Sequence, residues 1–249
     1  MTLGLVRTDD YDGVSRRAAE WVAAFLSESP GAVVALPTGR TPLGMYATLR
    51  AIAVETDLDV SGVRLMNLDE ILGLDPNHEH SFHRMLRDAL LDHAPFSACT
   101  RRLLDGATSD PQAECARHEA ALRAWGGLDL AILGIGANGH IAFNEPGTGV
   151  ASRTHVAALR TSTVEQLGLS GDVDQGERVT ALTMGIGTIL YAGAILLLAS
   201  GRAKARVLDA AFHGPITQEN PASALQRHPK VTIIADREAL CLWSEGESR

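Results

Sequence analysis

A histidine in a glycine-rich loop is the clearest sign of chemistry in this sequence of 249 residues. His140 lies two residues after Asn138 and five residues before Glu145, and Gly136 and Gly139 precede it. Histidine titrates near neutral pH, and a neighbouring amide and carboxylate can fix its tautomer. The glycine spacing imitates the dinucleotide-binding fingerprint without matching it, and no acidic residue closes a following strand about 20 residues later. The loop therefore predicts acid–base chemistry and not nicotinamide binding.

Two adjacent acidic residues, Asp69 and Glu70, follow a short apolar stretch at residues 63–68. Neighbouring carboxyl groups can differ strongly in pKa, which leaves one of them able to remove a proton bound to carbon. The structural alternative is a helix start in which Asp69 is the N-cap and Glu70 lies in the first turn. The residues alone leave both interpretations open.

A third segment, Thr38-Gly39-Arg40-Thr41-Pro42, has the features of an anion-binding loop. Gly39 permits close approach of the backbone, and free amides at the start of a helix attract an anion. Arg40 adds a cation suited to a phosphate monoester. The loop lacks the spacing of a nucleotide P-loop. A turn that only starts a helix, with Thr41 as N-cap and Pro42 in the first helical position, would use the same residues.

The elements that must position these three segments alternate along the chain. Helical spacing of apolar residues predicts helices over 14–26, 81–91 and 204–212, with another beginning at Thr41–Pro42. Short apolar runs predict strands at 32–36, 63–68, 128–133, 194–200 and 231–235. This pattern indicates an α/β fold of three layers, Rossmann-like in a modified form, with a mainly parallel sheet and helices on both faces. Ligands bind beyond the carboxyl ends of such strands, where all three segments lie.

The composition limits the class of protein. With 45% hydrophobic and 21% charged residues the chain should be globular, and without a proline- or serine-rich linker residues 1–249 are predicted to form a single domain. An aromatic content of 4% and a net charge of −8 disfavour nucleic acids and anionic membranes as partners. Any anionic ligand should be a small molecule.

Neither the cysteines nor the histidines outside the loop predict a special site. The three cysteines are odd in number and have no C-x-x-C spacing, so no disulfide framework or zinc knuckle is expected. His78, His80 and His83 lack a fourth ligand at a recognisable interval, so no metal is expected either. The N-terminus has no basic start followed by an apolar core, and no apolar run reaches the roughly 20 residues needed to cross a bilayer, so a cytoplasmic location is expected.

Five short motifs follow one another between about residues 33 and 235. They are Leu36-Pro37-Thr38-Gly39-x-Thr41-Pro42-Leu43-Gly44, Asn67-Leu68-Asp69-Glu70, Gly139-His140-Ile141-Ala142-Phe143-Asn144-Glu145-Pro146-Gly147, Ser152-Arg153-Thr154 and Ala181-Leu182-Thr183-Met184-Gly185. In order and spacing the set resembles the glucosamine-6-phosphate deaminase (isomerase) family. Five motifs in register are a highly specific signal, and they span most of the chain.

The resemblance implies a cofactor-free reaction that converts glucosamine 6-phosphate and water to fructose 6-phosphate and ammonia. Asp69 resembles the base that moves a proton from C2 to C1, and His140 resembles the group that opens the sugar ring. Asn138 and Glu145 match the residues that orient and polarise this histidine. The resemblance also implies a phosphate site, at positions in the Thr38–Thr41 loop (Gly39 and Thr41) and at Lys204.

The sequence departs from the family pattern at two places. Many relatives have a phosphate-binding arginine in the stretch that is 163–169 here, and this chain has none. Arg40, where relatives mostly have a small residue, is the expected replacement, with a solvated surface arginine as the alternative. Where allosteric relatives have two basic residues this chain has His155 and Ala157, so activation by an acetylated sugar phosphate is not expected. A homo-oligomer stays open, because neither departure decides the oligomeric state.

Three other functions remain to be weighed against the deaminase. A galactosamine-6-phosphate deaminase would share the motifs and differ only in the configuration at C4 of its sugar. A 6-phosphogluconolactonase shares the fold and a Gly-His loop, but Phe143-Asn144-Glu145-Pro146 follows the histidine in the deaminase manner. A sugar-phosphate sensor without turnover would not need the intact set of Asp69, His140 and Glu145.

Overall fold

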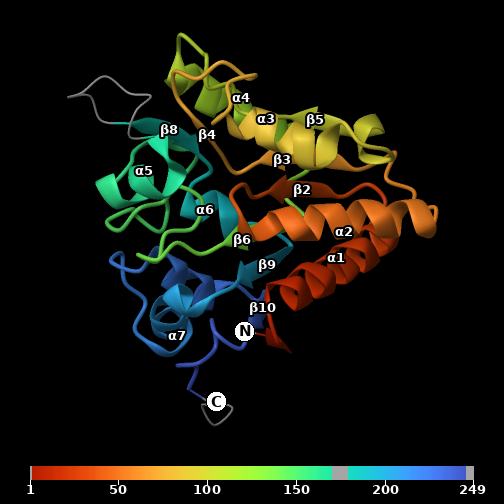
Figure 1. Cartoon of the computed structure of the whole chain (residues 1–249). Coiled ribbons are helices and arrows are strands. Elements are labelled where there is room, and N and C mark those ends of the chain that lie inside the picture. Colours follow the sequence, from red (N-terminus) through yellow and green to blue (C-terminus); the bar gives the residue numbers. More distant parts are fainter. Residues whose placement is uncertain (1, 170–178, 245–249) are drawn as a thin grey trace.

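The central sheet of the computed structural model, which describes residues 2–169 and 179–244, contains seven strands in the order β1-β10-β9-β6-β2-β3-β5 (Figure 1). Every neighbouring pair is parallel. The strands are Thr2–Thr8 (β1), Val33–Leu36 (β2), Arg64–Asn67 (β3), Thr100–Arg102 (β5), Leu130–Gly134 (β6), Ala194–Ala199 (β9) and Lys230–Asp236 (β10). The predicted α/β fold with a mainly parallel sheet is confirmed.

A smaller antiparallel sheet follows the order β4-β8-β7. Its strands are Asp69–Ile71 (β4), His155–Ala158 (β7) and Thr180–Thr183 (β8). The α-helices are Tyr11–Glu28 (α1), Thr41–Glu55 (α2), Phe82–Leu86 (α3), Pro111–Ala124 (α4), Thr161–Leu167 (α5), Ile186–Ile189 (α6) and Ala205–His213 (α7). Short helical turns occupy Arg87–Leu91 (η1), Phe96–Ala98 (η2), Arg202–Lys204 (η4) and Pro221–Arg227 (η5). No helix in the described ranges is both long enough and apolar enough to span a membrane.

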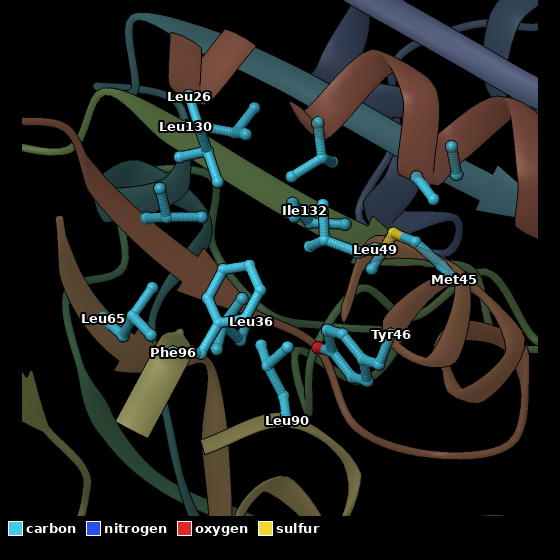
Figure 2. Packing of buried hydrophobic residues seen from close by; sticks show 14 of the residues in the cluster. Leu26, Leu36, Met45, Tyr46, Leu49, Leu65, Leu90, Phe96, Leu130 and Ile132 are labelled. Atoms are coloured by element: carbon cyan, nitrogen blue, oxygen red, sulfur yellow. The ribbon is translucent and has the colours of Figure 1, made fainter. Parts of the chain in front are cut away.

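Alternate residues of the buried strands face opposite sides of the central sheet. In β2, Val34 and Leu36 belong to one apolar cluster and Val33 and Ala35 to another. The first cluster packs against α1, α2 and the turn after α3, and Figure 2 shows Tyr46 of α2 within it. The second packs against α4, α6 and α7. Helices therefore cover both faces, which explains why the strands are apolar throughout.

Some predicted elements differ from those observed. The predicted helix 81–91 consists of α3 followed by the π-helical turn η1. Thr41 is not an N-cap: Arg40 before it already has helical backbone angles (φ −73°, ψ −36°), so α2 begins at Thr41 without a side-chain cap. The alternative in which Asp69 caps a helix is wrong, because Asp69 and Glu70 lie in β4 and pair with Thr183 and Leu182. Strands β1, β4, β5, β7 and β8 and helices α4, α5 and α6 were not predicted.

The segments identified in the sequence follow the carboxyl ends of four adjacent strands of the central sheet. These strands are neighbours in the order β9-β6-β2-β3. The chain continues from β2 into the Thr38–Thr41 loop, from β3 to Asp69, from β6 to His140 and from β9 to Lys204. The topology thus brings together residues as far apart in the chain as Thr38 and Lys204.

Candidate active site

A cleft of about 510 Å³ lies at the carboxyl ends of these strands. Seven of the nine predicted site residues line it: Thr38, Gly39, Arg40, Thr41, Asp69, His140 and Lys204. The other two, Asn138 and Glu145, do not line the cleft and contact the backbone and side chain of His140. The nine residues predicted from the sequence therefore form one continuous group.

Two tyrosines hold the loop that follows β2. The hydroxyl of Tyr46, buried in the core, donates to the Pro37 carbonyl at 2.6 Å. The hydroxyl of Tyr11 donates to the Arg40 carbonyl at 3.0 Å and accepts the Gly44 amide at 2.9 Å. Gly39 has φ +91°, a conformation that favours glycine. The start of α2 is therefore held by side chains of α1 and α2.

Asp69 is placed by Asn67, the last residue of β3. The Asn67 side chain donates to the Asp69 carbonyl at 2.7 Å and accepts the Leu104 amide at 2.8 Å. The Asp69 carboxylate is buried at the cleft wall and accepts the Thr38 hydroxyl at 3.3 Å. Burial, followed by the charge of Glu70, raises the pKa of Asp69 to about 8, against the opposing effect of the Thr38 hydrogen bond. Asp69 is thus a base of near-neutral strength.

The imidazole of His140 rests against the backbone of Gly136. A Cβ atom at position 136 would lie 2.4 Å from Cε1 and 2.5 Å from each ring nitrogen of His140, which is too close for any side chain. The Gly136 amide donates to the His140 carbonyl at 2.9 Å, and Gly139, with φ +88°, completes the turn. Glycine at position 136 is required by this contact with the ring.

Glu145 faces His140 without lining the cleft, and its carboxylate accepts hydrogen bonds from several other groups. Its Oε2 accepts Asn138 Nδ2 at 2.7 Å and lies 3.9 Å from His140 Nδ1. Its Oε1 accepts the hydroxyl of Thr163, in helix α5, at 2.5 Å, and the Arg160 amide at 3.4 Å. Nδ1 is buried and makes no hydrogen bond to the described residues, but it faces this carboxylate, whose charge favours a proton on Nδ1 and leaves the lone pair on Nε2.

Burial shifts the protonation of two basic side chains in the site, His140 and Lys204. It lowers the pKa of His140, assisted by the charge of Lys204 and opposed by that of Glu145. Burial also lowers the pKa of Lys204. The imidazole is therefore neutral over more of the neutral pH range than a solvated histidine, which suits a group that must accept a proton.

Two residues with contacts at the site were not predicted as functional. Thr163 is buried and bonds Glu145, although it lies 18 positions further along the chain. Met85 of α3 lines the cleft, and its Sδ accepts the Gly39 amide at 3.2 Å. Both contacts join distant segments, so no local pattern indicates them. The only indication of Thr163 in the sequence is its position in residues 163–169, the stretch where many relatives have a phosphate-binding arginine.

Other residues noted in the sequence lie outside the cleft. Arg153 pairs with Glu119 of α4, which also accepts the Thr154 amide and hydroxyl, so this motif joins α4 to the chain before β7. Cys99 and Cys115 are buried, and burial raises the pKa of both thiols. Within residues 2–169 and 179–244, no three His, Cys, Asp or Glu side chains lie together as a metal site.

Comparison with known proteins agrees with this geometry. Residues 9–234 match the family described as glucosamine-6-phosphate isomerases/6-phosphogluconolactonase. The chain is 40% identical to the glucosamine-6-phosphate deaminase of Geobacillus sp. (strain WCH70) over 96% of this chain and 95% of the relative. It is 41% identical to the enzyme of that name from Halalkalibacterium halodurans, over 95% and 96% of the two chains.

Two solved structures extend the comparison to the fold. A monomeric glucosamine-6-phosphate deaminase superposes with a TM-score of 0.88 at 37% identity, over 96% of this chain and 99% of that one. The 6-phosphogluconolactonase of Trypanosoma brucei superposes with a TM-score of 0.80 at 19% identity, over 98% and 99%. At that identity the second likeness concerns the fold alone.

Proposed function

Because this chain belongs to the family of glucosamine-6-phosphate isomerases and 6-phosphogluconolactonases, we propose that it converts glucosamine 6-phosphate and water to fructose 6-phosphate and ammonia. The family resemblance predicted from five motifs is confirmed. The observation that carries the proposed reaction is the presence in one cleft of two separate acid–base groups, Asp69 and His140, beside the Thr38–Thr41 loop and Lys204. Ring opening and enolisation need two such groups.

The sugar must open before its carbon acid can react. In the closed ring C1 carries no carbonyl, so the hydrogen on C2 is not acidic. Nε2 of His140 can take the proton from the C1 hydroxyl and return it to the ring oxygen, which yields the open-chain aldehyde. Glu145 stabilises the imidazolium that exists between these two transfers, because its carboxylate lies 3.9 Å from Nδ1.

Asp69 then acts on the open sugar. Its carboxylate removes the proton from C2, and the electron pair of the C2–H bond forms the C1=C2 double bond of the enolamine. The displaced carbonyl pair stays on the C1 oxygen, which becomes an alcohol by taking one proton from the ammonium group on C2. Return of the proton to C1 gives the imine at C2, water adds to that carbon, and ammonia leaves. The charge that develops on oxygen calls for preorganised donors, and the amides of Gly136 and Gly139 are not among them, because they donate to the carbonyls of His140 and Gly136. The phosphate would lie against Gly39, Thr41 and Lys204.

The rival functions are separated by the comparisons and by one experiment. The relatives at 38–41% identity are named deaminases, whereas the lactonase structures share only the fold. We therefore expect release of ammonia and ketose phosphate from glucosamine 6-phosphate, measured beside galactosamine 6-phosphate and 6-phosphogluconolactone. Preferential turnover of the galactosamine sugar or of the lactone would replace the proposed substrate, and absence of turnover of all three would favour a sensor.

Gly136→Ala should lower kcat/KM at least about tenfold, because the new methyl group cannot coexist with the observed His140 ring position. The measurement is steady-state kinetics together with thermal unfolding. Gly31→Ala is the matched control, since a Cβ there meets nothing within 4 Å and the position is distant from the cleft. Wild-type kinetics in Gly136→Ala would show that the ring need not lie against the loop.

Arg40→Ser should raise KM for the sugar phosphate about tenfold, because a charge-assisted hydrogen bond contributes about 1.5–3 kcal/mol. Arg40 lines the cleft and is exposed, whereas Lys204 is half-buried. Lys204→Ala should weaken binding as well, and the double variant should lose more than either alone. Unchanged KM in Arg40→Ser at low ionic strength, where salt does not screen the charge, would return Arg40 to the solvated surface.

A further inference from the structure

Glu70 is a second buried carboxylate beside the proposed base, and the reaction above does not use it. Only 1% of its surface is exposed. Its Oε1 accepts the amides of Ile71 and Phe82 at 2.9 and 3.0 Å, and its Oε2 accepts the His83 amide at 2.7 Å and the Ser81 hydroxyl at 3.1 Å. All four partners are donors, so the site fits an ionised carboxylate better than a carboxylic acid or an amide.

These bonds tie the strand that carries Asp69 to the start of helix α3. That helix forms part of the cleft through Phe82 and Met85, and the Met85 sulfur accepts the Gly39 amide of the loop after β2. Glu70 therefore lies at the junction between the proposed base and a wall of the cleft. Loss of its bonds would free both β4 and α3.

The charge of Glu70 acts on its neighbour as well. Like charges in a buried region oppose each other, and Glu70 is the second cause, after burial, of the raised pKa of Asp69. Burial also raises the pKa of Glu70 itself, but its hydrogen bonds from Phe82, His83, Ile71 and Ser81 all favour the ionised form.

We propose that Glu70 is a positioning residue that ties the strand carrying Asp69 to the start of α3 and keeps a negative charge at the position next to the base; this rests on the proposed function. The other titratable or charged groups near the pair are Tyr46 from α2, His83 beside Glu70, and the basic side chains that line the cleft: Arg40, His140 and Lys204. Replacing Glu70 leaves all of these in the chain, and Glu70→Asp, which keeps the charge, separates the effect of the removed charge from that of the altered hydrogen bonds.

The decisive experiment is a titration of Asp69 by NMR in protein labelled with ¹³C at the aspartate carboxyl groups, with Asp69→Asn identifying the signal. Glu70→Gln should lower the pKa of Asp69 by about one unit. Glu70→Asp, which keeps the charge, should leave the pKa of Asp69 within about half a unit of wild type while kcat falls about tenfold. If Glu70→Gln does not fold, Glu70→Asp tests the proposal alone. A fall of one unit or more in the pKa of Asp69 in that variant would overturn the proposal.

A matched control separates this effect from the general cost of altering a buried carboxylate. Glu114 of α4 is equally buried and accepts the Asp105 amide at 3.1 Å, so Glu114→Gln should lower stability without moving the titration of Asp69. An Asp69 pKa that stays constant or rises in Glu70→Gln would overturn the role of the charge. The titration needs no turnover, so it gives its answer even where an inactive wild-type protein disproves the proposed reaction.

The positioning role has its own test. Ser81→Ala removes one donor and keeps the charge of Glu70, so kcat should fall several-fold with KM and the pKa of Asp69 nearly unchanged. Ser81→Thr, which restores the hydroxyl, should recover kcat. Wild-type kcat in Ser81→Ala would show that the bonds to α3 do not position the base.

Discussion

Asp69→Asn is expected to lower kcat by about 10²–10⁴-fold, the range typical for loss of a general base, with little change in KM. The amide has nearly the shape of the carboxylate and can still accept the Thr38 hydroxyl, but it cannot take the proton from C2. The measurements are steady-state kinetics with glucosamine 6-phosphate and the exchange of the C2 hydrogen for solvent deuterium. Exchange should be lost together with product formation.

A carboxylate at the opposite edge of the sheet provides the control for this variant. Asp129 is exposed and accepts the Val33 amide at 2.8 Å where β2 begins, so Asp129→Asn should keep the wild-type kcat. Continued exchange of the C2 hydrogen at the wild-type rate in Asp69→Asn would remove this residue from the role of base.

The raised pKa of Asp69 adds two pH dependences to the same prediction. The carboxyl group must be ionised to act, so kcat/KM should rise with pH up to about 8. Between the ordinary aspartate pKa of 3.8 and about 8 the folded protein holds a proton that the unfolded chain has released, so the free energy of unfolding falls as pH rises through this window. Asp69→Asn does not lose stability in this way. The difference in melting temperature between this variant and wild type should therefore grow in favour of the variant from about pH 4 to pH 8 and stay constant above pH 8.

The sequence predicts those parts of the site that depend on local patterns. An apolar strand followed by a glycine turn, an acid or a histidine is visible in adjacent residues, and this is how Gly39, Asp69 and His140 stand out. Parallel pairing then brings strand ends together, which follows from the fold class and needs no knowledge of individual contacts.

Several parts that were not predicted depend on contacts between distant segments. The chain from β3 to β4 reads as one continuous stretch, but the Asn67 side chain bonds the Asp69 carbonyl and the Leu104 amide, and the Met184 amide donates to the Leu68 carbonyl. Because of these bonds, the chain leaves the central sheet at Leu68 and enters the smaller antiparallel sheet. Strand β1 likewise owes its existence to pairing with β10, more than 200 positions away.

His140→Gln is expected to lower kcat/KM for glucosamine 6-phosphate by about 10²-fold or more, because an amide cannot carry a proton between the C1 hydroxyl and the ring oxygen. Enolisation of an analogue that cannot close its ring should fall much less, since Asp69 performs that step from a different strand. Both rates are measured on the same preparation of the variant.

Two further variants, at His228 and at Glu145, complete the experiment. His228 is buried and its Nε2 lies 2.7 Å from the Ala192 carbonyl, outside the cleft, so His228→Gln should affect stability without discriminating between closed and open sugars. Glu145→Gln should reproduce the selective loss on the closed sugar in weaker form, because Asn138 and Thr163 still hold the side chain while the charge facing Nδ1 is gone. Equal losses on closed and open substrates in His140→Gln would mean that the histidine acts after the ring has opened, and the assignment of ring opening to Nε2 would be wrong.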